Sequence, residues 1–237
     1  MRQTLLSGAQ QFNLTLTQTQ LTAFEQYSQE LIAWNQKVNL TRIIEPHEIA
    51  IKHFLDSLSA NLALPDLPAG FALIDVGSGA GFPGLPLKIA RPDLRLTLLE
   101  STGKKTAFLQ HLVDLLNLAN VTILTARAEE ADHLPQHRER YDVAIARAVS
   151  PLPVLAEYTL PLVKVGGRVI AQKGQNPAAE VKEAANALGI LGGKLSQILP
   201  VVVPGLEAER HLVVIQKVKP TPRQYPRRPG LPAKKPI

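Results

Sequence analysis

The segment Leu73-Ile74-Asp75-Val76-Gly77-Ser78-Gly79-Ala80-Gly81-Phe82-Pro83-Gly84 decides the fold of this chain. An apolar run that ends in an acid and opens into alternating glycines predicts a strand, a tight turn and the start of a helix. Glycine reaches positive φ and has no side chain, so such a turn brings bare backbone against a ligand. A second apolar run at 95–100 ends in Glu100. Because an acid at that point of α/β nucleotide-binding folds holds a ribose diol, we expect an adenosine-like cofactor.

Two kinds of adenosine cofactor are compatible with this turn. The spacing of glycines over 79–84 matches the Gly-x-Gly-x-x-Gly fingerprint of dinucleotide binding. Asp75 argues against a dinucleotide, because its carboxylate would repel a pyrophosphate and would complement the ammonium and sulfonium of S-adenosylmethionine. Pro83 and Pro86 also crowd a helix start where phosphate binding needs free N–H groups. We therefore expect S-adenosylmethionine, with a dinucleotide or a ligand-free turn as the alternatives.

Composition restricts the class of protein. A chain of 237 residues, 45% of them hydrophobic, is enough for one α/β domain with an appendage. The absence of cysteine excludes disulfides, thiolate metal sites and a cysteine nucleophile. The N-terminus lacks the apolar core of a signal peptide, and no apolar run is long enough to span a membrane. The spacing of His47, Glu48 and His53 is not that of a zinc motif. We expect a soluble cytoplasmic protein without a metal or a membrane partner.

The positive charge is concentrated at the C-terminus. The chain carries 26 Lys and Arg against 20 Asp and Glu, a net charge of +6. Seven of these cations and none of the acids lie in 211–237, so the remainder, with 19 cations against 20 acids, is close to neutral. A locally concentrated basic segment indicates a nucleic acid or another anionic surface as the partner.

Hydrophobic periodicity divides the chain into three parts. Spacings of three and four predict helices in an N-terminal helical appendage over 1–65, one capped by Thr17 or Thr19 and another beginning near Pro46. From 66 to 218 strands and helices alternate, which predicts a parallel sheet with right-handed crossovers. With S-adenosylmethionine as the expected cofactor, we assign this range as the methyltransferase domain. The basic, proline-rich tail over 219–237 favours extended polyproline geometry over a packed element. The expected strands are 71–76, 95–100, 121–126, 141–146, 167–172, 197–203 and 211–218, and the expected helices 84–91, 103–118, 151–164 and 176–188.

The last two expected strands have no helix between them. Residues 204–210 read as a hairpin connection, so the seventh strand should run antiparallel to its neighbours. This pattern favours a seven-stranded, doubly wound α/β sheet of the S-adenosylmethionine-dependent methyltransferase type over the dinucleotide-binding version.

Side chains suited to a binding site follow the predicted strands at the edge where their carboxyl ends meet. Glu100, at the second strand end, is the candidate for the ribose hydroxyls. Ala128 and Glu129 follow the third, where a backbone N–H could meet the adenine edge. Arg147, at the end of the fourth, needs an anionic or carbonyl partner, and it belongs either to the site or to an ion pair with a carboxylate such as Asp142.

The fourth strand end also restricts the methyl acceptor. Methylation of exocyclic amines commonly uses Asn or Asp followed by Pro-Pro and an aromatic, and this chain has Ile145-Ala146-Arg147-Ala148 instead. Carbon methylation of pyrimidines needs the missing cysteine. These absences leave an atom that is already nucleophilic, such as a ring nitrogen, for which alignment supplies much of the rate. No catalytic base is identified, and Arg147 is the one candidate for a catalytic role.

A set of short motifs is spread along nearly the whole chain. They are Trp34-Asn35-x-x-x-Asn39-Leu40-Thr41, His53-x-x-Asp56-Ser57, the glycine turn, Glu129-Glu130, Ala146-Arg147-Ala148, Lys173-Gly174, Glu209-Arg210-His211 and Thr221-Pro222-x-x-Tyr225-Pro226-Arg227-Arg228-x-Gly230-x-Pro232. Together these motifs resemble the bacterial ribosomal RNA small subunit methyltransferase G family, also called glucose-inhibited division protein B. Ala146 stands where the family usually has Ser, and Glu100 where some members have Asp.

The resemblance implies methyl transfer from S-adenosylmethionine to ring nitrogen seven of one guanine in 16S rRNA, as free RNA or in a small ribosomal subunit particle. With the residues of the turn and strand ends, it implies a cofactor site comprising Asp75, Gly77, Gly79, Phe82, Glu100, Ser101, Thr102, Ala128, Glu129 and Arg147.

The basic tail is the expected RNA contact. We expect its cations to bind phosphate, so that deleting 219–237 weakens RNA binding and leaves cofactor affinity intact. We also expect a monomer. The alternatives are a small-molecule methyltransferase that acts without RNA and a non-catalytic RNA-binding assembly factor. The cations expected to bind RNA are Arg223, Arg227, Arg228, Lys234 and Lys235.

Overall fold

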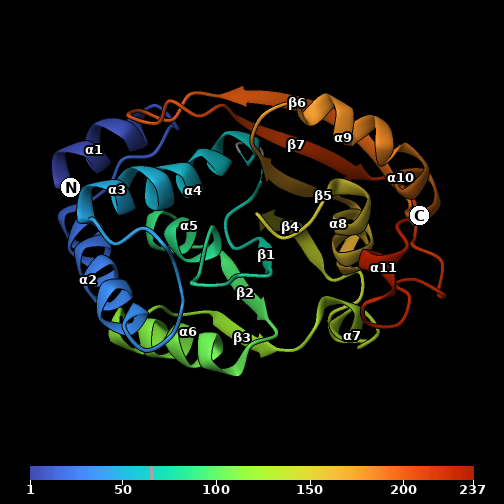
Figure 1. Ribbon diagram of the computed structural model, residues 1–237, viewed down its shortest axis with the longest axis horizontal. Coiled ribbons are helices and arrows are strands. Elements are labelled where there is room, and N and C mark those ends of the chain that lie inside the picture. The colour runs from blue at the N-terminus through green and yellow to red at the C-terminus, as the bar shows by residue number, and fades with distance from the viewer. Residues whose placement is uncertain (65–66) are drawn as a thin grey trace.

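A seven-stranded sheet with helices on both faces forms the centre of the computed structural model, which describes residues 1–64 and 67–237 (Figure 1). The strand order is β3-β2-β1-β4-β5-β7-β6. The first five strands run parallel, and β7 runs antiparallel to both β5 and β6, as the hairpin connection predicted. The strands are β1 (Ala72–Val76), β2 (Arg95–Glu100), β3 (Val121–Thr125), β4 (Tyr141–Arg147), β5 (Val163–Lys173), β6 (Gly193–Val201) and β7 (Arg210–Lys217).

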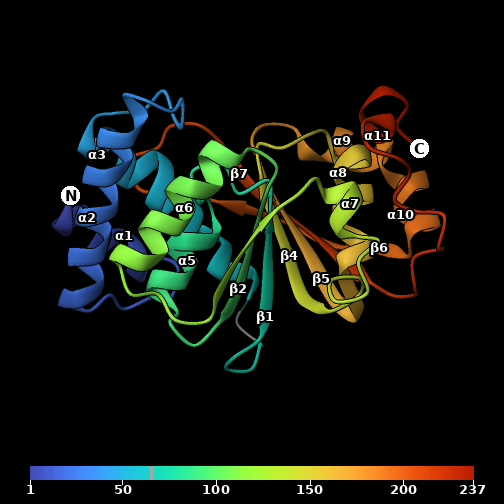
Figure 2. The same cartoon turned by 90° about the horizontal axis from the view of Figure 1, so that it is seen from below.

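The helices divide between the two faces in the order of the chain. Those up to residue 115 pack on one face and share one apolar core with the sheet, and those after residue 127 pack on the other face around a second core (Figure 2). The first group is α1 (Arg2–Gln10), α2 (Gln18–Asn35), α3 (Pro46–Ile49), α4 (Asp56–Leu58), α5 (Gly84–Ala90) and α6 (Gly103–Leu115). The second group is α7 (Ala128–Ala131), α8 (Leu152–Thr159), α9 (Pro177–Glu183), α10 (Ala185–Leu191) and α11 (Leu231–Lys234).

The elements lie close to their predicted positions, with differences at the boundaries. Thr17 caps α2 by accepting from Gln20 N, and the next helical segment begins at Pro46. That segment continues through a π-helical stretch at Ala50–Leu55 to a 3-10 turn at Ser59–Ala63. The helix expected over 151–164 ends at Thr159, since a 3-10 turn containing a proline follows it. The helix expected over 176–188 is two short helices, α9 and α10.

The N-terminal helices pack against the central sheet. Tyr27 of α2 and Phe54 are fully buried in the same core as Leu73 of β1. The Tyr27 hydroxyl donates to the Ala80 carbonyl in the glycine turn at 2.5 Å. The expected boundary at 65/66 falls on residues outside the described ranges. On the described residues, the N-terminal helices directly support the turn.

The C-terminal tail is also packed, which corrects the expectation of an extended segment. Thr221, Pro226 and Pro232 are buried, and the tail includes the short helix α11. Figure 2 shows this red segment beside α7 and α8. Prolines restrict the backbone of a tail, but they do not prevent it from docking on side chains that supply hydrogen bonds.

Candidate active site

The glycine turn after β1 has the backbone geometry that its sequence predicted. Gly77, Gly79 and Gly81 have φ values of +73°, +58° and +98°. The N–H groups of Gly77 and Ser78 donate to the Leu99 carbonyl of β2, at 2.8 and 3.1 Å, and hold the turn against the sheet. A Cβ at Gly77 would lie 2.7 Å from a methyl of Val149. The turn therefore requires glycine both for its φ angle and for space.

Asp75 lies beneath this turn. Its side chain is fully buried, and Oδ2 accepts from Gly84 N at 2.9 Å, at the start of α5. Its other oxygen, Oδ1, has no hydrogen-bond partner among the residues that the structure describes. Burial raises the pKa of Asp75 to about 7. Asp75 therefore supports the turn from below, whereas the sequence placed it facing the cofactor.

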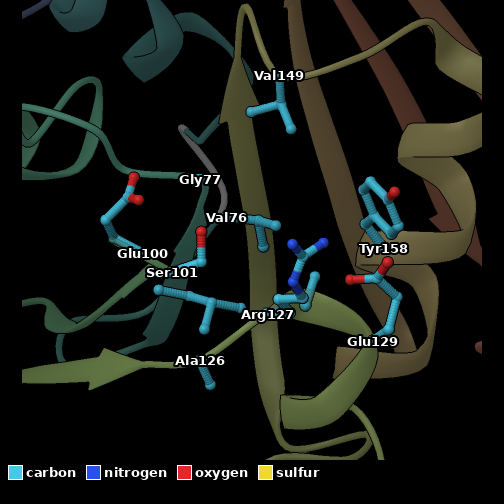
Figure 3. A pocket seen from close by; sticks show the side chains of 11 residues that line it. Val76, Gly77, Glu100, Ser101, Ala126, Arg127, Glu129, Val149 and Tyr158 are labelled. Atoms are coloured by element: carbon cyan, nitrogen blue, oxygen red, sulfur yellow. The ribbon is translucent and has the colours of Figure 1, made fainter. Parts of the chain in front are cut away.

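A first cavity opens at the ends of β1, β2 and β3 (Figure 3). Glu100 borders it and is 6% exposed. Its carboxylate accepts from Gly79 N at 3.0 Å and from Thr102 N at 2.8 Å, which fixes its orientation beside the glycine turn. The residues that line this first cavity are Val76, Gly77, Leu99, Glu100, Ser101, Ala126, Arg127, Ala128, Glu129, Val149 and Tyr158.

The structure brings only part of the expected cofactor set to this cavity. Gly77, Glu100, Ser101, Ala128 and Glu129 line it, while Gly79 and Thr102 act through their N–H bonds to Glu100. The other three expected residues, Asp75, Phe82 and Arg147, do not line it.

The predicted site set omitted several residues of the first cavity, among them Val149 and Tyr158. Val149 follows the fourth strand end by two residues, so a wider window there would have included it. Tyr158 comes from the middle of α8, where no local signal marks it, and lies beside Glu129 in Figure 3.

A second cavity, of about 640 Å³, lies on the other side of the β4 end. Its basic side chains outnumber its single acid, Asp56. Asp56 is 2% exposed. Its Oδ2 accepts a hydrogen bond from Arg147 at 2.8 Å, and its Oδ1 accepts one from Arg210 at 2.9 Å. The residues that line this second cavity are Ile43, Lys52, His53, Asp56, Arg147, Ala148, Gln172, Lys173, Gly174, Leu206, Ala208 and Arg210.

The carboxylate partner of Arg147 is therefore Asp56. Asp142, the partner considered from the sequence, instead pairs with Lys164 and accepts from Ala72 N. Arg147 also donates to the Lys52 carbonyl at 3.1 Å. The α4 side of the fold thus holds the guanidinium at the mouth of the second cavity.

A stack of rings forms the wall behind Arg147. Phe82 stacks on His53 at 4.5 Å and on Tyr27 at 5.4 Å, and the Arg147 guanidinium carbon lies 5.0 Å from the Phe82 ring centre. Burial, together with the charge of Arg147, lowers the pKa of His53 to about 3, so this imidazole is neutral at pH 7. Because an arginine can only donate, His53 Nδ1 accepts from Arg147 at 3.3 Å, and Nε2 carries the hydrogen that faces Thr41 Oγ1 at 2.7 Å.

The two cavities flank the end of β4. Arg147 and Ala148 line the second cavity, and the next residue, Val149, lines the first. Ala148, which separates Arg147 from Val149 in the chain, has a φ of +55°, an uncommon conformation for a residue with a side chain. β4 pairs with β1, where the strand order reverses, which is the position of ligand sites in open α/β sheets.

The basic tail presents only some of its cations to solvent. Arg227 is bound by Glu157 through its backbone N–H, Nε and Nη2, at 2.7, 2.9 and 2.7 Å. The prediction of Arg227 as a phosphate ligand is therefore wrong for this conformation, because its guanidinium already has a carboxylate partner. The other four expected cations, Arg223, Arg228, Lys234 and Lys235, are exposed, and we call them the exposed tail cations.

Two further features bear on function. Within residues 1–64 and 67–237, no helix combines the length and apolar character needed to cross a bilayer. The same described ranges contain no group of three or more His, Asp or Glu placed to hold a metal ion.

A seven-stranded sheet with an antiparallel β7, a glycine turn after β1 and an acid ending β2 define the class of S-adenosylmethionine-dependent methyltransferases. The model of the rRNA small subunit methyltransferase G family matches residues 20–213, and the chain belongs to this family. It is 54% identical over 233 residues to the ribosomal RNA small subunit methyltransferase G of Roseiflexus sp. (strain RS-1), covering 98% of each chain.

Solved structures with much lower identity share the fold. TrmN from Thermus thermophilus is similar with a TM-score of 0.52 and 21% identity, over 68% of this chain and 49% of that one. Geranyl diphosphate C-methyltransferase from Streptomyces coelicolor A3(2), solved with Mg2+, geranyl diphosphate and S-adenosyl-L-homocysteine, gives a TM-score of 0.56 and 15% identity, over 81% and 98% of the two chains.

Proposed function

We propose that this methyltransferase transfers a methyl group from S-adenosylmethionine to ring nitrogen seven of a guanine in 16S rRNA, as a cytoplasmic monomer acting on the RNA or on a small-subunit particle. The observation that carries the proposal is the pair of cavities on either side of the β4 end. One carries the acid and bare backbone suited to an adenosine group, and the other is basic and large enough for a nucleotide.

The residues of the first cavity have the chemistry that the cofactor needs. Glu100 is oriented by two N–H bonds at its rim and is the group for the ribose hydroxyls, with Ser101 and Thr102 beside it. Gly77 offers backbone without a side chain, and the start of α7 at Ala128 and Glu129 offers N–H groups for an adenine edge. Asp75 Oδ1, which has no hydrogen-bond partner among the described residues, supplies negative potential beneath the turn when the carboxyl is ionised and then complements a cationic cofactor.

Phe82 and Arg147 lie next to the second cavity and not in the first. The Phe82 ring stacks on the neutral His53, which lines the second cavity, and Arg147 is held over the Phe82 ring by Asp56. S-adenosylmethionine supplies an electrophilic methyl group to such a site. His53 and Arg147, fixed by these contacts, limit the positions that an acceptor base can adopt in the second cavity, which favours an in-line approach.

The second cavity is the proposed acceptor site. Lys52, Arg147 and Arg210 line it, each paired with a carboxylate: Glu48 for Lys52, and Asp56 for both arginines. Two arginines share the single Asp56 charge, so this part of the cavity keeps an excess of N–H donors for the phosphate and carbonyl groups of a guanine nucleotide. Ring nitrogen seven of guanine has an available lone pair, so no residue has to remove a proton before transfer. Catalysis then depends on positioning and electrostatics, and the site needs no general base.

RNA outside the acceptor base is proposed to contact the exposed tail cations. These four side chains lie on the outer surface of the packed tail, while the inner side of the tail faces α7 and α8. Contacts of this kind add affinity that depends on salt and not on base sequence.

The two alternatives have less support. A small-molecule methyltransferase does not explain membership in an rRNA methyltransferase family or the basic second cavity. A non-catalytic assembly factor does not require the oriented Glu100 beside an intact glycine turn.

Purified protein should be incubated with methyl-labelled S-adenosylmethionine and either 16S rRNA or small-subunit particles from a strain that lacks the endogenous enzyme. We expect label to appear as 7-methylguanosine at one position, identified by mass spectrometry of RNA fragments. Comparing the two substrates shows which one the enzyme uses. Label at another atom would contradict the assigned acceptor, and no transfer to either substrate would refute the proposal.

A further inference from the structure

Three carboxylates of the methyltransferase domain hold the C-terminal tail at successive points. Glu139 Oε1 accepts from Thr221 N at 2.8 Å, near the start of the tail. Glu157 of α8 binds Arg227 through three N–H groups of that residue. Glu129 Oε1 accepts from Gly230 N at 2.9 Å. Acids of the methyltransferase domain thus anchor the tail at three points along its length.

Donors of the domain bind the tail carbonyls in return. Arg138 donates to the carbonyls of Thr221 and Tyr225 at 3.0 and 2.8 Å. His133 Nε2 faces the Pro226 carbonyl at 3.0 Å. Both partners in this contact therefore satisfy polar backbone groups that would otherwise need water.

Glu157 makes undocking costly. Its side chain is 1% exposed, and its charge partner is Arg227. Asp132 is fully buried close by, and burial raises its pKa well above the ordinary range, with Glu129 and Glu157 adding to the effect. Without Arg227, the domain would keep the buried Glu157 carboxylate without the cation that pairs with it, which is strongly unfavourable.

The anchors of the tail overlap the lining of the first cavity. Glu129 lines the cavity through α7 and also accepts the bond from Gly230. Tyr158, the residue after Glu157 on α8, lines the cavity beside Glu129 (Figure 3). Gly230 therefore contacts the cavity residue Glu129 directly, and Arg227 is linked to the cavity residue Tyr158 through its neighbour Glu157.

We propose that the tail over 219–237 is part of the cofactor site: its docking positions Glu129 and Tyr158, and tail docking and cofactor binding stabilise each other. This inference rests on the proposed function only in taking S-adenosylmethionine as the ligand of the first cavity. It replaces the expectation that the tail can be removed without loss of cofactor affinity. The outer surface of the tail stays available to RNA.

The first test measures cofactor affinity in the full-length chain. S-adenosylhomocysteine is titrated calorimetrically into wild type, Arg227→Ala, Arg227→Lys and the control Lys219→Ala, which removes an exposed positive charge at the start of the tail. Coupling between two sites usually changes affinity about 5- to 150-fold, so we expect at least a fivefold higher Kd for Arg227→Ala. Arg227→Lys should recover part of the affinity, and Lys219→Ala should match wild type.

The second test uses wild type alone and does not depend on how well a variant folds. Coupling is reciprocal, so saturating S-adenosylhomocysteine should slow hydrogen exchange at the tail amides of Thr221, Arg227 and Gly230. Amides of α1, which lies at the opposite end of the molecule from the tail (Figure 1), should not change. Equal tail exchange with and without ligand would overturn the proposal, as would wild-type affinity in Arg227→Ala. If wild type itself does not bind S-adenosylhomocysteine, the proposed function fails instead.

Discussion

Replacing Asp75 by asparagine should change how the stability of this protein depends on pH. Asp75 is fully buried, and its pKa in the folded chain is about 7, compared with an ordinary value of 3.8. Below pH 3.8 both folded and unfolded chains carry the proton. Between 3.8 and 7 the unfolded chain loses it and the folded chain keeps it, so the free energy of unfolding falls as pH rises. Above pH 7 this contribution is constant.

The size of the effect follows from the width of that window. Each pH unit inside it lowers the free energy of unfolding by about 1.4 kcal/mol. From pH 5.5 to pH 8 the wild type crosses about 1.5 units of the window, a loss of about 2 kcal/mol. The carboxamide that Asp75→Asn introduces cannot ionise, yet its oxygen can still accept from Gly84 N. The free energy of unfolding of Asp75→Asn, relative to that of wild type, should therefore rise by about 2 kcal/mol between pH 5.5 and pH 8. This difference corresponds to roughly 4–8 °C in Tm.

Thermal and urea unfolding of wild type and Asp75→Asn at pH 5.5 and pH 8 would measure this difference. The other ionisable groups are present in both proteins, so their contributions cancel. Asp114→Asn, at an exposed position, is the matched control and should keep the wild-type pH slope. A stability difference between Asp75→Asn and wild type that is the same at both pH values would refute the argument.

Three other changes test separate parts of the site. Arg147→Ala should abolish methyl transfer with the fold retained, because it removes the cation held between Phe82 and Asp56, while Arg140→Ala, at an exposed position, should retain activity in the labelled-methyl assay. Gly77→Ala should lower the free energy of unfolding by about 1–3 kcal/mol and weaken S-adenosylhomocysteine binding in calorimetry, because of its positive φ and the contact with Val149. Its control, Gly103→Ala, meets no atom within 4 Å and should be neutral or stabilising in the same unfolding experiment. Replacing the four exposed tail cations by alanine should weaken RNA binding and reduce its salt slope by up to about 3, with cofactor affinity unchanged; an unaltered slope would exclude them as phosphate contacts.

Much of the site could be predicted because its signals are local. Glu100 was assigned from its place at the end of the second strand, and the structure places it at the first cavity. The same reasoning found Ala128 and Glu129, since parallel strands bring their carboxyl ends to one edge of the sheet. The hairpin connection likewise predicted the antiparallel β7. In each case a short stretch of sequence contains the whole signal.

The errors concern the direction of side chains and their distant partners. Asp75 was expected to face the cofactor, but the turn that follows it folds over its carboxylate. The partner of Arg147 is Asp56, 91 residues earlier in the chain, and no spacing rule links the two. The proline-rich composition suggested an extended tail. The sequence did not reveal that the tail docks, because the acids that anchor it lie on other elements.

The sequence by itself determined the class of fold, the glycine turn and the acid beside it, since these depend on backbone conformation and on the alternation of strands and helices. Only the tertiary structure decided that Asp56 joins Arg147 and Arg210, and that Glu157 pairs with Arg227, 70 residues away. A buried charge takes the partner that packing brings within hydrogen-bond distance, and packing joins residues whose separation in the chain carries no information. For that reason the tail, which looked like a free basic arm, is bound to the wall of the first cavity.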